Sequence, residues 1–69
     1  MANSTTEILR NNIKKFRESK NLTQEKLSEL AGISADYLSE IERGKKMPSI
    51  KRLIQISEAL DIEIYKFFK

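Results

Sequence analysis

Cysteine and histidine are both absent from this chain of 69 residues. The lack of cysteine excludes disulfide bonds and thiolate chemistry, and the two absences together remove the usual ligands of structural zinc. The carboxylates that are present, such as Glu25 and Glu29, have no histidine or cysteine to act with them and no phosphate-binding loop. We therefore expect no metal, no cofactor and no enzymatic activity.

Long apolar runs are missing as well. No stretch approaches the roughly 20 residues that are needed to cross a bilayer. The N-terminal residues are polar and lack the apolar core of a signal peptide. A secreted domain of this size would usually need disulfide bonds. The sequence therefore predicts a cytoplasmic protein without a membrane partner.

Glycine and proline are scarce, so each one is informative about boundaries. The two glycines are Gly32 and Gly44, and the single proline is Pro48. A chain this short hides only about 60% of the surface that its unfolded form exposes, which is enough for one core and no more. We expect a flexible N-terminus over residues 1–6 and a single domain over residues 7–69.

Local signals divide the chain into five expected helices, and no segment alternates with the period of a strand. The expected N-caps are Ser4 or Thr5, Thr23, Ser34 and Ser49, and Ser4 has capping-box spacing to Glu7. The expected stops are Asn21, Gly32, Gly44 and the pair Asp61 and Ile62, followed by a last short helix over about residues 63–68. The predicted fold class is therefore all-α.

Apolar residues at helical intervals predict which side of each helix is buried. For the first three helices these are Leu9, Ile13, Phe16, Leu27, Leu30, Ala31, Leu38 and Ile41. In the fourth helix Ile50, Leu53, Ile54, Ser57 and Leu60 are expected to share the buried face, with Ile56 at its side.

Charge is unevenly distributed along the chain, although the net charge is only +3. Residues 23–42 carry one basic and five acidic side chains, whereas residues 43–52 carry five basic and no acidic ones. A compact basic block of this kind suits an edge that contacts phosphates. It is equally typical of an ordinary solvated loop, and charge alone does not decide between the two.

The second and third expected helices satisfy several constraints of a helix-turn-helix together. Ser28 is small where the third helix must cross closely, and Gly32 lies in the turn, where a positive φ is needed. Ile33, Leu38 and Ile41 would point into the angle between the two helices. The second helix of such a motif is able to enter the major groove of DNA.

Three segments resemble the Xre/Cro-type family, which includes phage repressors and the controller proteins of restriction–modification systems. They are residues 22–27 (LTQEKL), 31–34 (AGIS) and 37–45 (YLSEIERGK), and the similarity extends over nearly all of residues 8–68. The resemblance implies a five-helix, lambda-repressor-like domain. It also implies a sequence-specific regulator of transcription that binds double-stranded DNA, as a repressor or as a controller protein.

The resemblance also implies a DNA-binding surface centred on residues 34–43. With Leu38 and Ile41 inward, a rotation of roughly 100° per residue places Asp36, Ser39, Glu40 and Arg43 outward. The family reads bases from the positions of Ala35, Asp36, Ser39 and Glu40, and uses the loop that contains Lys45 and Lys46 against the DNA backbone. The full expected set is Thr23, Gln24, Ser34, Ala35, Asp36, Tyr37, Ser39, Glu40, Arg43, Lys45 and Lys46.

Several of these residues have a second interpretation. Thr23, Ser34 and Asp36 could serve as helix caps, and Gln24 could be an ordinary surface glutamine instead of a phosphate or base contact. The Tyr37 ring could pack on the second helix, or its hydroxyl could reach a phosphate. Because ionised Asp36 and Glu40 only accept hydrogen bonds, cytosine N4 is a possible target, but the sequence does not identify the bases.

The basic residues of the first expected helix fall into two groups. The family pairs an arginine at the position of Arg17 with the glutamate at the position of Glu42, and this implies a partly buried structural ion pair. Arg10, Lys14 and Lys15 are expected to be plain solvated charges.

The C-terminal apolar cluster offers a candidate surface for a homodimer. One recognition helix covers few base pairs, and a two-fold dimer binds two half-sites about 34 Å apart in a near-palindromic operator. We expect Phe67 in the core, and Ile64, Tyr65 and Phe68 at the dimer interface, unless this cluster only closes the domain's own core. No small-molecule ligand is expected. The alternative to a regulator is an antitoxin or another protein-interaction module with the same fold.

Overall fold

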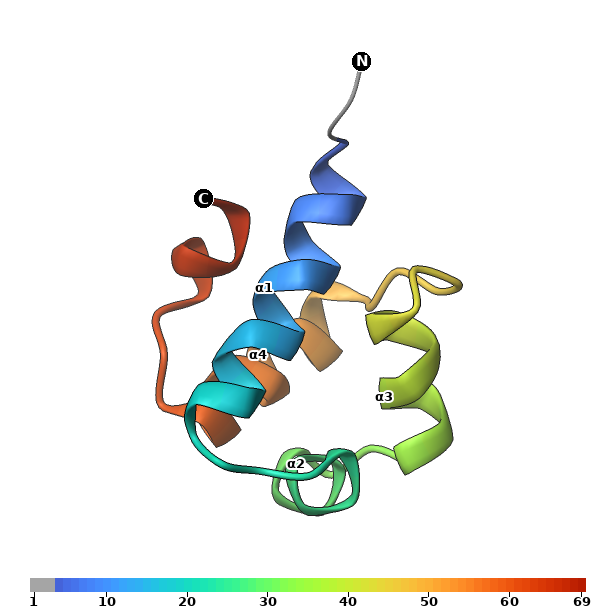
Figure 1. Ribbon diagram of the computed structural model, residues 1–69, viewed down its shortest axis with the longest axis vertical. Coiled ribbons are helices and arrows are strands. Elements are labelled where there is room, and N and C mark those ends of the chain that lie inside the picture. The colour runs from blue at the N-terminus through green and yellow to red at the C-terminus, as the bar shows by residue number, and fades with distance from the viewer. Residues whose placement is uncertain (1–3) are drawn as a thin grey trace.

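The computed structural model describes residues 4–69, and these residues form four α-helices and one short 3-10 helix (Figure 1). In chain order they are α1 (Thr5–Ser19), α2 (Gln24–Ala31), α3 (Ala35–Glu42), α4 (Ile50–Leu60) and the 3-10 helix η1 (Ile64–Phe68). Residues 4–69 contain no strand, so the all-α prediction is confirmed. The prediction of five α-helices is wrong for the last segment. Its five residues form only a short 3-10 helix, and Glu63 makes no side-chain capping bond.

A serine or threonine hydroxyl caps the start of every α-helix, as the sequence predicted. Each oxygen accepts a hydrogen bond from the backbone N–H three residues later, which satisfies one of the N–H groups that a helix start leaves unpaired. The bonds are 3.1 Å at Ser4, 3.0 Å at Thr23, 3.0 Å at Ser34 and 3.2 Å at Ser49.

The structure describes only part of segment 1–6, which the sequence predicted to be flexible. Residues 1–3 lie outside the described part of the chain. Ser4 is the N-cap of α1, and residues 5 and 6 form part of its first turn.

Every α-helix also ends in the same way: a residue that follows the helix adopts the left-handed conformation, and the chain changes direction there. The left-handed residues are Asn21, Gly32, Gly44 and Asp61, with φ of 58°, 74°, 78° and 56°. The N–H of the next residue then donates to the carbonyl five positions back, which is the Schellman pattern. After α1, α2 and α4 that next residue is apolar and packs against the core: Leu22, Ile33 and Ile62. After α3 it is the exposed Lys45, so here the chain leaves the body of the molecule.

Ten apolar side chains from all five helices form the core: Leu9, Ile13, Leu27, Ala31, Leu38, Ile41, Leu53, Ile56, Leu60 and Phe67. Phe67 has no exposed surface, as the sequence predicted, and its ring packs against Phe16 with a centroid distance of 6.0 Å. The core therefore joins the C-terminal 3-10 helix to α1.

The predicted buried faces of α2 and α4 need correction. Leu30, Ile50 and Ile54 are exposed by 52%, 68% and 42%, whereas Ile56 is completely buried. In α4 the buried positions are 53, 56, 57 and 60, and this spacing turns Ile50 and Ile54 away from the core. The sequence alone could not separate Ile54 from Ile56, because both are isoleucines near the same stripe.

The helices are arranged so that α3 lies at one edge of the molecule (Figure 1). Helix α1 packs against η1 and α3, and α2 packs against α4 and α3. In Figure 1 α2 is seen end-on and α3 side-on, so the two helices cross steeply. No helix among residues 4–69 is both long and apolar enough to cross a membrane.

Candidate nucleic-acid interface

Helix α3 presents a buried face and a solvent-facing face. Leu38 and Ile41 are 0% and 1% exposed, which confirms the rotation that the sequence predicted. Asp36 and Arg43 are exposed on the other side, and Ser39 and Glu40 are half-buried. Ser34 lies exposed at the N-cap, with the half-buried Ala35 as the first residue of the helix. The expected base-reading positions therefore lie together on the outer face of α3.

Cations from the end of α3 cover part of this outer face. The Arg43 Nε donates to Ser39 Oγ at 3.2 Å, one turn back. The Lys46 Nζ lies 3.5 Å from Glu40 Oε1. Both contacts lie on the face that the sequence predicted to be open.

Tyr37 packs against the body of the molecule. Its ring is half-buried against the core, and with Gly32, Ile33, Ser34 and Arg52 it lines a shallow hollow beside the turn between α2 and α3. The Lys46 Nζ lies 6.0 Å from the centroid of the ring. The ring therefore packs against the core beside the turn that follows α2; packing on α2 itself and the phosphate contact of the hydroxyl stay predictions.

The basic loop that follows α3 is tied to the end of that helix through its backbone. Lys45 N–H and Lys46 N–H both donate to the carbonyl of Glu40, at 2.8 Å and 3.3 Å. Gly44 adopts the left-handed conformation that this turn requires. The side chains of Lys45 and Lys46 are exposed, so the loop carries positive charge at a defined place next to the outer face of α3.

The predicted ion pair between Arg17 and Glu42 is present, and it is bidentate. Arg17 Nε donates to Glu42 Oε2 at 2.8 Å, and Arg17 Nη2 donates to Glu42 Oε1 at 3.1 Å. The two residues are only 9% and 5% exposed. The hydrogen bonds to Glu42 raise the pKa of the Arg17 guanidinium above its ordinary value, and burial offsets only part of this. The third donor, Arg17 Nη1, bonds to the carbonyl of Leu22 at 2.7 Å.

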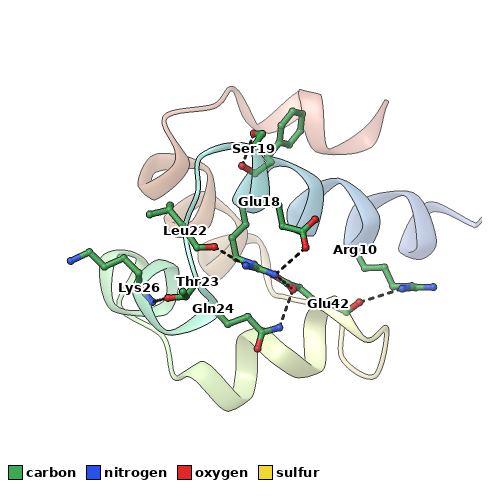
Figure 2. A network of polar contacts seen from close by, with 10 residues as sticks. Arg10, Glu18, Ser19, Leu22, Thr23, Gln24, Lys26 and Glu42 are labelled. Carbon is green, nitrogen blue, oxygen red and sulfur yellow. Dashed lines mark hydrogen bonds and ion pairs between the residues drawn. The ribbon is translucent and has the colours of Figure 1, made fainter.

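Gln24 joins the same network. Its Nε2 donates to Glu42 Oε1 at 3.0 Å, so the first residue of α2 is bonded to the last residue of α3 (Figure 2). The interpretation of Gln24 as an ordinary surface glutamine is therefore wrong, because its amide has an internal partner. A DNA contact by the rest of this amide stays a prediction.

Arg10 was expected to be a plain solvated charge, and this expectation is wrong. Its Nη1 donates to the main-chain carbonyl of Glu42 at 3.2 Å, so two arginines two turns apart on α1 both bind the last residue of α3 (Figure 2). A Cβ at Gly44 would lie only 2.9 Å from Arg10 Cδ. No sequence signal could have found this contact, because its acceptor is a carbonyl that every residue possesses. Lys14 and Lys15 are exposed, as expected.

The candidate dimer residues belong to the apolar cluster at the C-terminus and not to the outer face of α3. Tyr65 and Phe68 are exposed by 54% and 41%, whereas Ile64 is half-buried against the core. Ile54 and Ile62 line a shallow hollow together with Ile64. Ile54 was not predicted as a surface residue, because its spacing in the sequence indicated a place in the core.

Comparisons with known proteins agree with this geometry. The family model described as helix-turn-helix matches residues 13–67. The control protein C.SmaI of Serratia marcescens is 33% identical over 60 residues, which cover 87% of this chain and 71% of that protein. The crystal structure of the restriction–modification controller protein C.AhdI from Aeromonas hydrophila superposes with a TM-score of 0.88 at 30% identity, covering 91% of this chain and 96% of that one.

A third relative has been solved with DNA. SinR, a helix-turn-helix transcriptional regulator of Bacillus subtilis, is 39% identical over 54 residues, which cover 77% of this chain and 49% of SinR. The structure of SinR in complex with DNA superposes with a TM-score of 0.84 at 34% identity, covering 88% of this chain and 98% of that one. The resemblance to controller proteins that the motifs indicated is confirmed, and this chain belongs to the helix-turn-helix family.

Proposed function

We propose that this protein is a transcriptional regulator that binds double-stranded DNA in a sequence-specific way. The observation that carries the proposal is the outer face of α3, because this helix lies at one edge of the molecule and is followed by an exposed basic loop. The similarity to SinR, which was solved in complex with DNA, and to the control protein C.SmaI supports the same conclusion.

In this proposal α3 enters the major groove and separates two kinds of contact. Ala35, Asp36, Ser39 and Glu40 face the base edges, where hydrogen bonds discriminate between sequences. Arg43, Lys45 and Lys46 face the phosphates, which adds affinity without sequence information.

The starts of α2 and α3 supply further phosphate contacts. Helix N-termini carry N–H groups and a partial positive charge that favour anions. Thr23, Gln24 and Ser34 lie at these two starts. The Tyr37 hydroxyl is assigned to the same backbone contacts, with its ring packed on the protein side.

We further propose that the protein acts as a homodimer on a near-palindromic operator. An α3 of eight residues is only about 12 Å long, so one copy covers few base pairs. The proposed contact between the two copies consists of the exposed Tyr65 and Phe68 together with Ile64 and Ile54, which line one hollow. Ile54→Asp is expected to convert a dimer into a monomer in sedimentation velocity. Leu30→Asp, at an exposed leucine on α2, should leave the dimer intact. A wild-type protein that sediments as a monomer also when bound to DNA would contradict the dimer.

Selection of bound sequences from random DNA at two salt concentrations tests the main proposal. The wild type should enrich one near-palindromic site, and its affinity should fall steeply with salt because counterions are released from the phosphates. A variant with Asp36→Ala and Ser39→Ala should lose or change the enriched sequence. A control variant with Lys14→Ala and Lys15→Ala, both on α1, should enrich the wild-type site. No enrichment by the wild type would overturn the proposal.

A further inference from the structure

The ion pair between Glu40 and Lys46 joins a base-reading position to a phosphate-contacting one. Glu40 lies on the outer face of α3, and Lys46 lies in the basic loop that follows. The Glu40 carbonyl accepts the backbone N–H of Lys46, and the Glu40 carboxylate lies 3.5 Å from its Nζ. The same Nζ lies 6.0 Å from the Tyr37 ring centroid. The lysine is thus folded back over the recognition helix in this structure.

We propose that Glu40 is an intramolecular competitor of DNA phosphates for Lys46, and that this competition lowers affinity for non-specific DNA. The inference rests on the proposed function. The Glu40 carboxylate is an anion with oxygen acceptors, as a phosphate is. Each of the two can therefore pair with the ammonium group of Lys46. To contact the DNA backbone, Lys46 has to leave Glu40, which then needs another donor.

A specific site is able to supply that donor, whereas an arbitrary sequence is not. The amino groups of cytosine N4 and adenine N6 project into the major groove and donate hydrogen bonds to a carboxylate. Where such a group faces Glu40, opening the ion pair is compensated. At other sites the released carboxylate has no partner and repels the phosphates. Glu40 therefore acts as a specificity-determining residue through Lys46 as well as through the bases.

The pair is well suited to such an exchange because both side chains are accessible to solvent. The side chains of Lys46 and Glu40 are 55% and 36% exposed, and exposed ion pairs are weak enough to open at a cost of at most about fivefold in a binding constant. Glu42, only two residues away, is not suited to this role, since it is buried and fully engaged by Arg17 and Gln24.

The variant Glu40→Gln tests the proposal with a short duplex of random sequence, titrated at several salt concentrations. The variant is expected to bind this DNA about two- to fivefold more tightly than the wild type. The dependence of log affinity on log salt should become steeper by about 0.9, the value for one additional phosphate contact. Misfolding cannot produce such a gain. Adding Lys46→Gln to Glu40→Gln should remove both changes.

The matched control is Glu29→Gln, which removes another exposed carboxylate from a lysine. Glu29 lies 3.4 Å from Lys26 on α2, away from the basic loop. This variant is expected to leave the salt dependence unchanged. An equal gain from Glu29→Gln, or no gain from Glu40→Gln while the wild type binds DNA, would overturn the competition. If neither the wild type nor Glu40→Gln binds any duplex, the proposed function itself fails, and the inference fails with it.

Discussion

The two faces of α3 differ in how far along the chain their contacts reach. On the inner side, Glu42 binds Arg17, 25 residues away, and Leu38 and Ile41 enter a core built from all the helices. On the outer side, Ser39 and Glu40 contact Arg43 and Lys46, which follow them closely in the sequence. The inner contacts fix where the helix lies, while the outer ones are exposed and exchangeable. The residues that fix the position of this short helix are therefore different from those proposed to contact bases.

Removing the buried charge of Glu42 should have the largest effect on the free energy of unfolding. Glu42→Ala leaves Arg17 buried without its partner and takes away the acceptor of Gln24, so we expect a loss of about 3–5 kcal/mol in the free energy of unfolding. Urea denaturation measures this loss, and Glu42→Gln serves as a milder variant if Glu42→Ala does not fold. The matched outer variant, Glu40→Ala, should cost at most about 1 kcal/mol. Equal losses from the two glutamates would contradict the distinction between the faces.

Alanine substitutions at the two glycines of the motif should have smaller effects on stability, and the two effects should differ from each other. An alanine in the left-handed region costs about 1–2 kcal/mol, and this applies to both Gly32→Ala and Gly44→Ala. Gly44→Ala should cost more in thermal unfolding. Its Cβ would lie 2.9 Å from Arg10 Cδ, so Arg10 would have to move and lose its hydrogen bond to the Glu42 carbonyl, whereas the nearest atom to a Cβ at Gly32 is 3.9 Å away.

The comparison of the glycines has its own control. In an Arg10→Ala background the difference between the two alanine variants should disappear, since the crowding atom is gone. A difference that persists would show that Arg10 does not constrain the loop.

Changes in the exposed loop should leave stability almost untouched and affect only DNA binding. Lys45→Gln is expected to alter the free energy of unfolding by less than about 0.5 kcal/mol. It should reduce the salt dependence of DNA affinity by about 0.9, the value for one lost phosphate contact. Titration at several salt concentrations checks this, with Lys20→Gln at the end of α1 as a control of equal charge. An unchanged salt dependence would remove Lys45 from the interface.

Helix boundaries could be predicted from the sequence because their causes are local. A hydroxyl at each start and a left-handed residue at each end act within a few positions, as Ser34 and Gly44 do for α3. The burial of Ile54 and Ile56 could not be distinguished, because the packing of α4 on α2 decides which of the two faces the core. The network around Glu42 was only half predicted. The family motif indicates Arg17, but Gln24 and Arg10 reach it through the fold alone.

The fixed ends of α3 have a consequence for how this protein can change its target. The length of the helix depends on Ser34 and Gly44, and its orientation depends on Leu38, Ile41 and Glu42. None of these side chains belongs to the solvent-facing set formed by Asp36, Ser39 and Glu40. If these three positions read the bases as proposed, new side chains there are expected to change the operator while the helix keeps its length and orientation.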